Sequence, residues 1–242
     1  MERHFEQELE ALREQLLVMG GRAETATRKA IRALERREPL LADEVYADDK
    51  AIDRLEIDIE ERCVRLLALQ QPMARDLRFI TAALKISNDL ERVGDHAVNI
   101  ARAAKHLTGV PRLAPAVDIP RLEGLATAML RDALDAFVRR DTDSARALCR
   151  RDDEVDELNR QIHQELLAFM LEAPPSIPHA LELILVARNL ERVADLATNV
   201  AEEVFSSPRR VSSNITPKPA RCSPPGRTHP PTTLAARDRG LQ

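Results

Sequence analysis

Two short runs of the chain carry carboxylates at a spacing that suits cation binding. Residues 90–101 read LERVGDHAVNIA and residues 190–201 read LERVADLATNVA, so eight of the twelve positions are identical. Each run keeps a Glu, an Asp four residues later and an Asn four residues beyond it: Glu91, Asp95 and Asn99, then Glu191, Asp195 and Asn199. Residues four apart lie in one row on an α-helix. Each run therefore predicts a ridge of adjacent polar side chains.

Two further acidic pairs lie on the segments that precede these runs. They are Asp49 with Asp53, and Asp152 with Asp156. The same rows continue with Glu56 and Glu60 in the first half of the chain and with Asn159 and His163 in the second. The eight acids of the four pairs are our candidate metal ligands, and Glu56, Glu60, Asn99, His163 and Asn199 are additional candidates. His96 has Leu196 in its place in the second run, so we do not assign it as a shared ligand.

The direction of the ridge decides between an interior and a surface site. With about 100° per residue, Leu90, Val93 and Ala97 share one side of the helix, and Glu91 and Asp95 lie on the other. We therefore expect the acids to face outward. Like charges four residues apart destabilise a helix, and a bound cation would relieve that repulsion. Oxygen ligands suit Mg, Ca, Mn and Fe, and a nearby imidazole adds Zn.

The elements that must position these acids are helices. Apolar residues recur at spacings of three and four, as in Leu9, Leu12 and Leu16, and aromatic residues are only 2% of the chain. We expect six helices, at about 2–37, 41–69, 73–107, 121–140, 142–170 and 179–206. Gly20-Gly21 weakens the first, where a bend could occur. The predicted fold is all-α: two tandem, internally duplicated three-helix bundles with a disordered C-terminal tail.

The predicted domain boundaries follow proline and charge. A first three-helix repeat covers 1–107, a linker 108–120, a second repeat 121–207 and a basic, Pro-rich tail 208–242. The tail has a net charge of +6, which leaves −10 for the rest. An acidic body with few aromatic residues argues against nucleic-acid binding. No apolar stretch is long enough to span a membrane, and the three cysteines form neither a metal motif nor a disulfide framework.

These motifs resemble the PhoU family, the regulatory proteins that accompany bacterial high-affinity phosphate transporters. The similar segments are residues 89–101, 187–204 and 71–78, together with the Asp-x-x-x-Asp pairs at 49/53 and 152/156. The resemblance spans about 1–207 and implies PhoU-like three-helix bundles with multinuclear metal clusters on their surfaces. Two features depart from the family: Leu196 stands where a His is common, and the tail has no counterpart.

The resemblance also implies a function. We expect a non-enzymatic, metal-binding adaptor in the cytoplasm that negatively regulates the phosphate-starvation response and so phosphate uptake and homeostasis. The expected partners are the ATPase component of the phosphate ABC transporter and the sensor histidine kinase of the phosphate two-component system. Either could recruit the protein to the membrane periphery. We also expect a homodimer and a divalent or multinuclear metal, with Fe, Zn, Mn and Mg as candidates.

Two alternatives remain open on the residues alone. The first is a helical scaffold whose acidic rows are solvated and bind no metal. The second is a di-iron carboxylate enzyme of the ferritin-like kind, which needs inward-facing Glu residues and Glu-x-x-His motifs on its helices. The motif helices of this chain lack Glu-x-x-His, and their acids are predicted to face outward.

Overall fold

A computed structural model describes residues 2–109 and 117–205. Within these ranges the regular elements are helices and no strand occurs, which confirms the predicted all-α fold. The elements are α1 (Glu2–Arg36), α2 (Pro39–Gln70), α3 (Ala74–Leu107), α4 (Ile119–Arg139), α5 (Thr142–Glu172), the short 3-10 helix η1 (Pro174–Ser176) and α6 (Ile177–Phe205). The six predicted helices are therefore all present, with ends that differ from the prediction by at most two residues.

Apolar periodicity explains why these segments are helical. In α1, the side chains of Leu9, Leu12 and Leu16 form one buried row, as their spacing predicts. In α2, Ile52 and Ile59 are fully buried on the face that packs inward. Each helix thus buries one stripe and leaves its polar residues at the edges or outside.

Prolines and caps set the helix ends. Pro39 lies in the first turn of α2, where its missing N–H costs nothing. Asp141 caps α5 by accepting hydrogen bonds from the backbone N–H groups of Asp143 and Ser144, at 3.0 and 3.1 Å. Helix α6 begins two residues earlier than predicted, because Pro178 is tolerated in a first helical turn.

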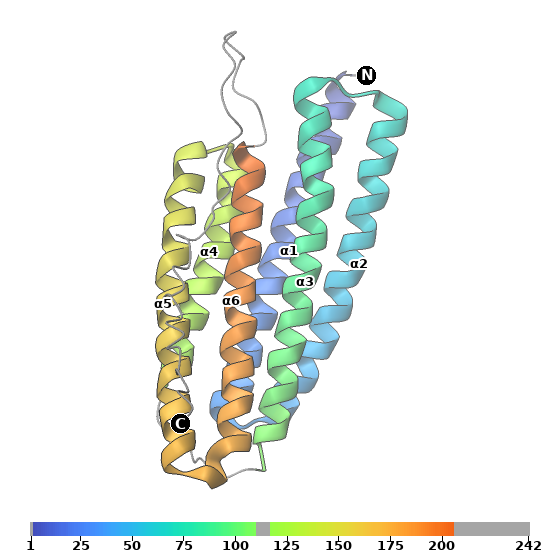
Figure 1. Ribbon diagram of the computed structural model, residues 1–242. Coiled ribbons are helices and arrows are strands. Elements are labelled where there is room, and N and C mark those ends of the chain that lie inside the picture. The colour runs from blue at the N-terminus through green and yellow to red at the C-terminus, as the bar shows by residue number, and fades with distance from the viewer. Residues whose placement is uncertain (1, 110–116, 206–242) are drawn as a thin grey trace, which may run out of the picture. The chain divides into compact units, whose positions relative to one another are not determined.

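The two repeats pack through α3 and α6 and through α1 and α4. Figure 1 shows α3 and α6 side by side, with α2 flanking α3 and α5 flanking α6. Three polar contacts join α3 to α6, namely Lys85–Glu203, His96–Asn189 and His106–Glu182. The residue number rises on one helix as it falls on the other, so the two helices are antiparallel. All six helices belong to one compact unit.

Gly20 has a packing role that the sequence did not predict. Helix α1 runs unbroken through Gly20-Gly21. A Cβ atom on Gly20 would lie 2.1 Å from Leu134 Cδ1 of α4, whereas a Cβ atom on Gly21 would meet nothing within 4 Å. Gly20 therefore lets the first helices of the two repeats approach each other closely.

Parts of the predicted organisation lie outside the described residues. These parts are most of the predicted linker, at positions 110–116, and the whole predicted tail, 208–242. Among the helices that the structure describes, none has a stretch long and apolar enough to cross a membrane.

Candidate metal centres

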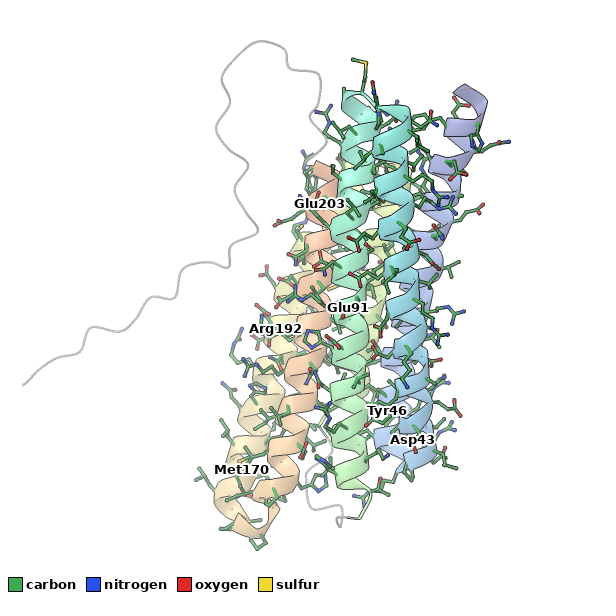
Figure 2. The ribbon with its side chains drawn as sticks, turned by 90° about the vertical axis from the view of Figure 1, so that its right-hand side faces the viewer. Asp43, Tyr46, Glu91, Met170, Arg192 and Glu203 are labelled. Atoms are coloured by element: carbon green, nitrogen blue, oxygen red, sulfur yellow. The ribbon has the colours of Figure 1, made fainter. Side chains whose placement is uncertain are left out.

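The apolar face of the repeated run anchors the acids of α3. Leu90, Val93 and Ala97 are fully buried, and the same positions of α6 are buried in the same way. Glu91 is half-buried beside α2, and Asp95 is exposed. Figure 2 shows Glu91 on α3, between α2 and α6, on the face turned to the viewer. The acids thus lie at the rim of the helix interface, partly covered by protein and partly open to solvent.

The first acidic cluster consists of Asp49, Asp53 and Glu56 on α2 and Glu91 and Asp95 on α3. Burial raises the pKa of Asp49 to about 6, and the charges of Asp53 and Asp95 add to the rise. Burial also raises the pKa of Glu91, and the four other acids of the cluster add to that rise. The structure therefore brings the two predicted acidic rows of the first repeat together.

The second acidic cluster consists of Asp152 and Asp156 on α5 and Glu191 and Asp195 on α6. Burial raises the pKa of Asp152 to about 6, and Asp156 and Asp195 contribute next. The pKa values of Asp156 and Glu191 are also raised, first by burial and then by Asp195. Arg160 opposes the rise at Asp156, and Arg192 and Arg188 oppose it at Glu191. All eight predicted acids therefore lie in two corresponding clusters.

Gly94 is the residue of α3 that admits Asp49 into the first cluster. A Cβ atom at position 94 would lie 2.8 Å from Asp49 Oδ1 and 3.2 Å from Ile52 Cδ1. The second repeat has Ala194 in this place. Close approach of α2 to α3 thus explains the one glycine of the first run.

The arginine that follows the motif Glu has a different partner in each repeat. Arg92 Nη1 lies 3.5 Å from Asp89 Oδ1, whereas Arg192 Nη1 lies 2.9 Å from Asp195 Oδ2. Asp89 is not among the predicted site residues, and the two repeats differ at this position, because the second has Asn189. The sequence difference between Asp89 and Asn189 could have indicated that Arg92 and Arg192 have different partners.

The additional candidate residues fall in different surroundings. Glu56 belongs to the first acidic cluster, whereas Asn99 accepts a hydrogen bond from Arg102 Nη1 at 3.2 Å. Glu60 and Asn199 are exposed. His163 has a buried Nε2 atom without a hydrogen-bond partner among the described residues, and Asn159, beside it in the row, has a buried Oδ1 atom in the same state.

His96 takes part in the contact between the repeats. Its Nδ1 atom lies 2.9 Å from Asn189 Oδ1 on α6. Leu196, its counterpart, is 2% exposed and packs in the core. His96 therefore makes a polar contact between α3 and α6, whereas Leu196 contributes to the apolar core.

The donor set of each cluster fits a cation by its chemistry. Carboxylate oxygens from two helices are the ligands that hard divalent ions prefer. Burial raises the pKa values of these acids, and the mutual repulsion of the carboxylates adds to the rise. Within residues 2–109 and 117–205, no three His, Cys, Asp or Glu side chains converge closely enough to enclose a metal ion. The helices thus bring the ligand positions together, while the side chains themselves are not arranged as a coordination shell.

The fold and the clusters define a class of protein, an all-α body built from two copies of one three-helix unit that carries paired acidic rows. The sequence model of the PhoU domain matches residues 16–104 and 119–204. The chain therefore belongs to the PhoU family.

Similar proteins and structures agree with this assignment. A phosphate-specific transport system accessory protein PhoU homolog of Clostridium acetobutylicum is 40% identical over 83% of this chain and 92% of its own length. One from Aquifex aeolicus is 44% identical over 76% of this chain and 84% of its own. The crystal structure of PhoU from Pseudomonas aeruginosa is 39% identical, with a TM-score of 0.80, over 83% of this chain and 97% of that one. The phosphate transport system regulatory protein PhoU from Streptococcus pneumoniae is 31% identical, with a TM-score of 0.77.

Proposed function

We propose that the protein is a non-enzymatic accessory protein of phosphate transport that negatively regulates the phosphate-starvation response. Its membership of the PhoU family supports this proposal, because similar family members are named accessory proteins of the phosphate-specific transport system. In this role the protein acts in the cytoplasm as an adaptor, as a homodimer. Its partners are the ATPase component of the phosphate transporter and the sensor histidine kinase.

The adaptor binds cations through its two acidic clusters. The observation that carries this part of the proposal is the half-buried set of like charges that recurs in both repeats. Asp49, Asp53, Glu91 and Asp95 hold metal in the first repeat, and Asp152, Asp156, Glu191 and Asp195 do so in the second. The metal is Fe, Zn, Mn or Mg, and its charge offsets carboxylate repulsion, so that loading fixes the surface presented to partners.

Deletion of the gene tests the regulatory part of the proposal. We expect a phosphate-starvation reporter to become active in high phosphate when the gene is deleted, and to be repressed again when the gene is restored. Unchanged repression after deletion would exclude the regulatory role.

Metal analysis tests the second part. Native protein is expected to contain metal, and the Asp95→Ala/Asp195→Ala double variant is expected to lose most of it. The matched control is Asp58→Ala/Glu165→Ala, which changes exposed acids of α2 and α5. Metal content that is nil in the native protein favours the scaffold without metal. A di-iron enzyme would require acids inside the bundle, whereas Glu91 and Asp95 lie at the rim of a helix interface.

A further inference from the structure

We infer that the two acidic clusters bind cations unequally. Arg192 already pairs with an acid of the second cluster, whereas no ion pair among the residues that the structure describes involves an acid of the first cluster. A divalent cation would then fill the first cluster before the second. This inference rests on the proposed cation binding. It adds the order in which the two clusters bind cations, and this order depends on residues outside the four acidic pairs.

Arg92 and Arg192 hold equivalent positions but pair with different acids. In the first repeat, Asp89 is a second carboxylate within reach of Arg92, and the ion pair that forms there draws the guanidinium away from the cluster. In the second repeat, the same place holds neutral Asn189, whose side chain contacts His96 and donates to the backbone oxygen of Leu185. Arg192 therefore pairs with Asp195, a member of the cluster.

The surrounding positions differ in charge in both directions. Asp153 adds a carboxylate beside the second cluster, where the first repeat has Lys50, but three other positions favour the first cluster. Two further arginines, Arg160 and Arg188, act on the acids of the second cluster. Their places in the first repeat hold Ile57 and Asn88, which are uncharged. The first cluster also contains the additional carboxylate of Glu56, where the second repeat has Asn159. Opposite charges attract and like charges repel, so a cation gains more at the first cluster and must displace Arg192 at the second.

The second cluster nevertheless keeps ligand atoms of its own. Asn159 is 6% exposed, and its Oδ1 atom is buried with no hydrogen-bond partner among the described residues. With about 100° per residue, Asn159 lies within about 20° of Asp152 around α5. Its counterpart Glu56 is close enough to Glu91 to raise the pKa of that acid. A buried oxygen without a hydrogen-bond partner, beside the carboxylates, is an atom that a bound cation would satisfy. The second cluster should therefore bind a cation, but more weakly than the first.

Titration of Mn²⁺ into the metal-stripped full-length protein tests the inference, with free Mn²⁺ measured by electron paramagnetic resonance. We expect a tight and a weak phase whose Kd values differ by about tenfold or more. Asp95→Ala should remove the tight phase, and Asp195→Ala the weak one. Equal affinities of the two clusters in the unaltered protein would overturn the inference.

Exchanging the arginine partners supplies a sharper test. Arg192→Gln should tighten the weak phase severalfold, and Asn189→Asp should do the same by offering Arg192 a carboxylate outside the cluster. Arg92→Gln is the matched control, and it should leave both phases unchanged, because Arg92 already pairs outside its cluster. A weak phase that does not respond to Arg192→Gln would also overturn the inference.

The three variants change half-exposed or exposed side chains, so they test the inference without disturbing the core. If Mn²⁺ binds to neither cluster in the unaltered protein, the proposed cation binding itself fails, and the inference fails with it. Two clusters of equal affinity would overturn the order of loading alone. The two failures are therefore distinguishable.

Discussion

Asp49 and Asp152 hold the same place in the two repeats, and the pKa of each is raised to about 6, mainly by burial. Between the ordinary value of 3.8 and about 6, the folded protein holds more protons at these groups than the unfolded chain does. The stability of the cation-free protein therefore falls as pH rises through that window and then levels off.

Replacing one of these aspartates tests this pH dependence. In chelator at about pH 7, Asp49→Asn is expected to raise the free energy of unfolding by about 1 kcal/mol, after allowance for solvent screening. Below the ordinary pKa both states are protonated, so the gain should vanish. Urea unfolding at the two pH values measures the effect, with Asp58→Asn on the exposed face of α2 as the control. If Asp49→Asn and the unaltered protein had equal free energies of unfolding at pH 7, the prediction would be wrong.

Gly94 gives a second prediction at this scale, on ligand geometry. Gly94→Ala should weaken Mn²⁺ binding to the first cluster about tenfold, because the new Cβ atom would force the Asp49 carboxylate to turn away. The stability should change little, because the preference of about 1 kcal/mol for Ala over Gly in a helix offsets the small shift that the new Cβ atom would impose on Ile52. The control is Gly124→Ala on α4, where a Cβ atom meets nothing within 4 Å. Affinity that survives Gly94→Ala would show that Asp49 is not a ligand.

The acids themselves could be predicted from the sequence, and their neighbours could not. Glu91 and Asp95 follow from spacing and repetition, because residues four apart share a helix face whatever the helix packs against. The role of Asp89 depends on how Arg92 is positioned, and the role of Gly94 on the distance between α2 and α3. Both depend on tertiary packing, which cannot be inferred from the spacing of residues along the sequence.

At the scale of elements, the glycine pair of α1 offers an internally controlled prediction. Gly20→Ala should destabilise the protein by about 1–3 kcal/mol, because the added methyl group would overlap Leu134 of α4. Gly21→Ala should stabilise it by about 0.5–1 kcal/mol through helix propensity alone. Thermal unfolding of the two variants measures the difference. A gain in stability with Gly20→Ala would mean that α1 and α4 do not approach closely at this point.

The helices were the most predictable feature of the chain. The row of Leu9, Leu12 and Leu16 indicates both a helix and its buried face, and Pro39 and Asp141 mark helix starts by local chemistry. The packing of Gly20 against Leu134 joins segments more than a hundred residues apart. No local pattern specifies such a contact. From the sequence, the two glycines therefore predict only a weakened stretch of the first helix, where a bend could occur.

At the scale of the whole molecule, cation binding should appear as added stability. A cation that binds the folded protein at about one hundred times its Kd contributes about 2.7 kcal/mol. We therefore expect Mn²⁺ to raise the Tm of the metal-stripped protein, and to do so much less in the Asp95→Ala/Asp195→Ala double variant. Adding excess chelator should reverse the shift. An equal rise in Tm for both proteins would place the binding elsewhere.

The duplication was evident in the sequence, but the way in which its halves associate was not. The similar runs at 90–101 and 190–201 indicate two similar units, but they do not show whether those units touch. In the structure, α3 and α6 pack antiparallel and α1 packs on α4, so both repeats share one compact unit. Contacts such as His96–Asn189 are made by residues that differ between the repeats, so comparing the copies does not reveal them.

The antiparallel pairing of α3 with α6 has a consequence for the ancestry of the chain. Equivalent helices that pack on each other in opposite directions are what a two-fold axis between identical subunits produces. A single three-helix ancestor could thus have built the same body as a homodimer, and gene fusion would have joined its halves. After fusion the two halves can differ in sequence, because a mutation in one half no longer appears in the other. Asn189 at the position equivalent to Asp89, and Leu196 at the position equivalent to His96, are differences that two identical subunits could not have.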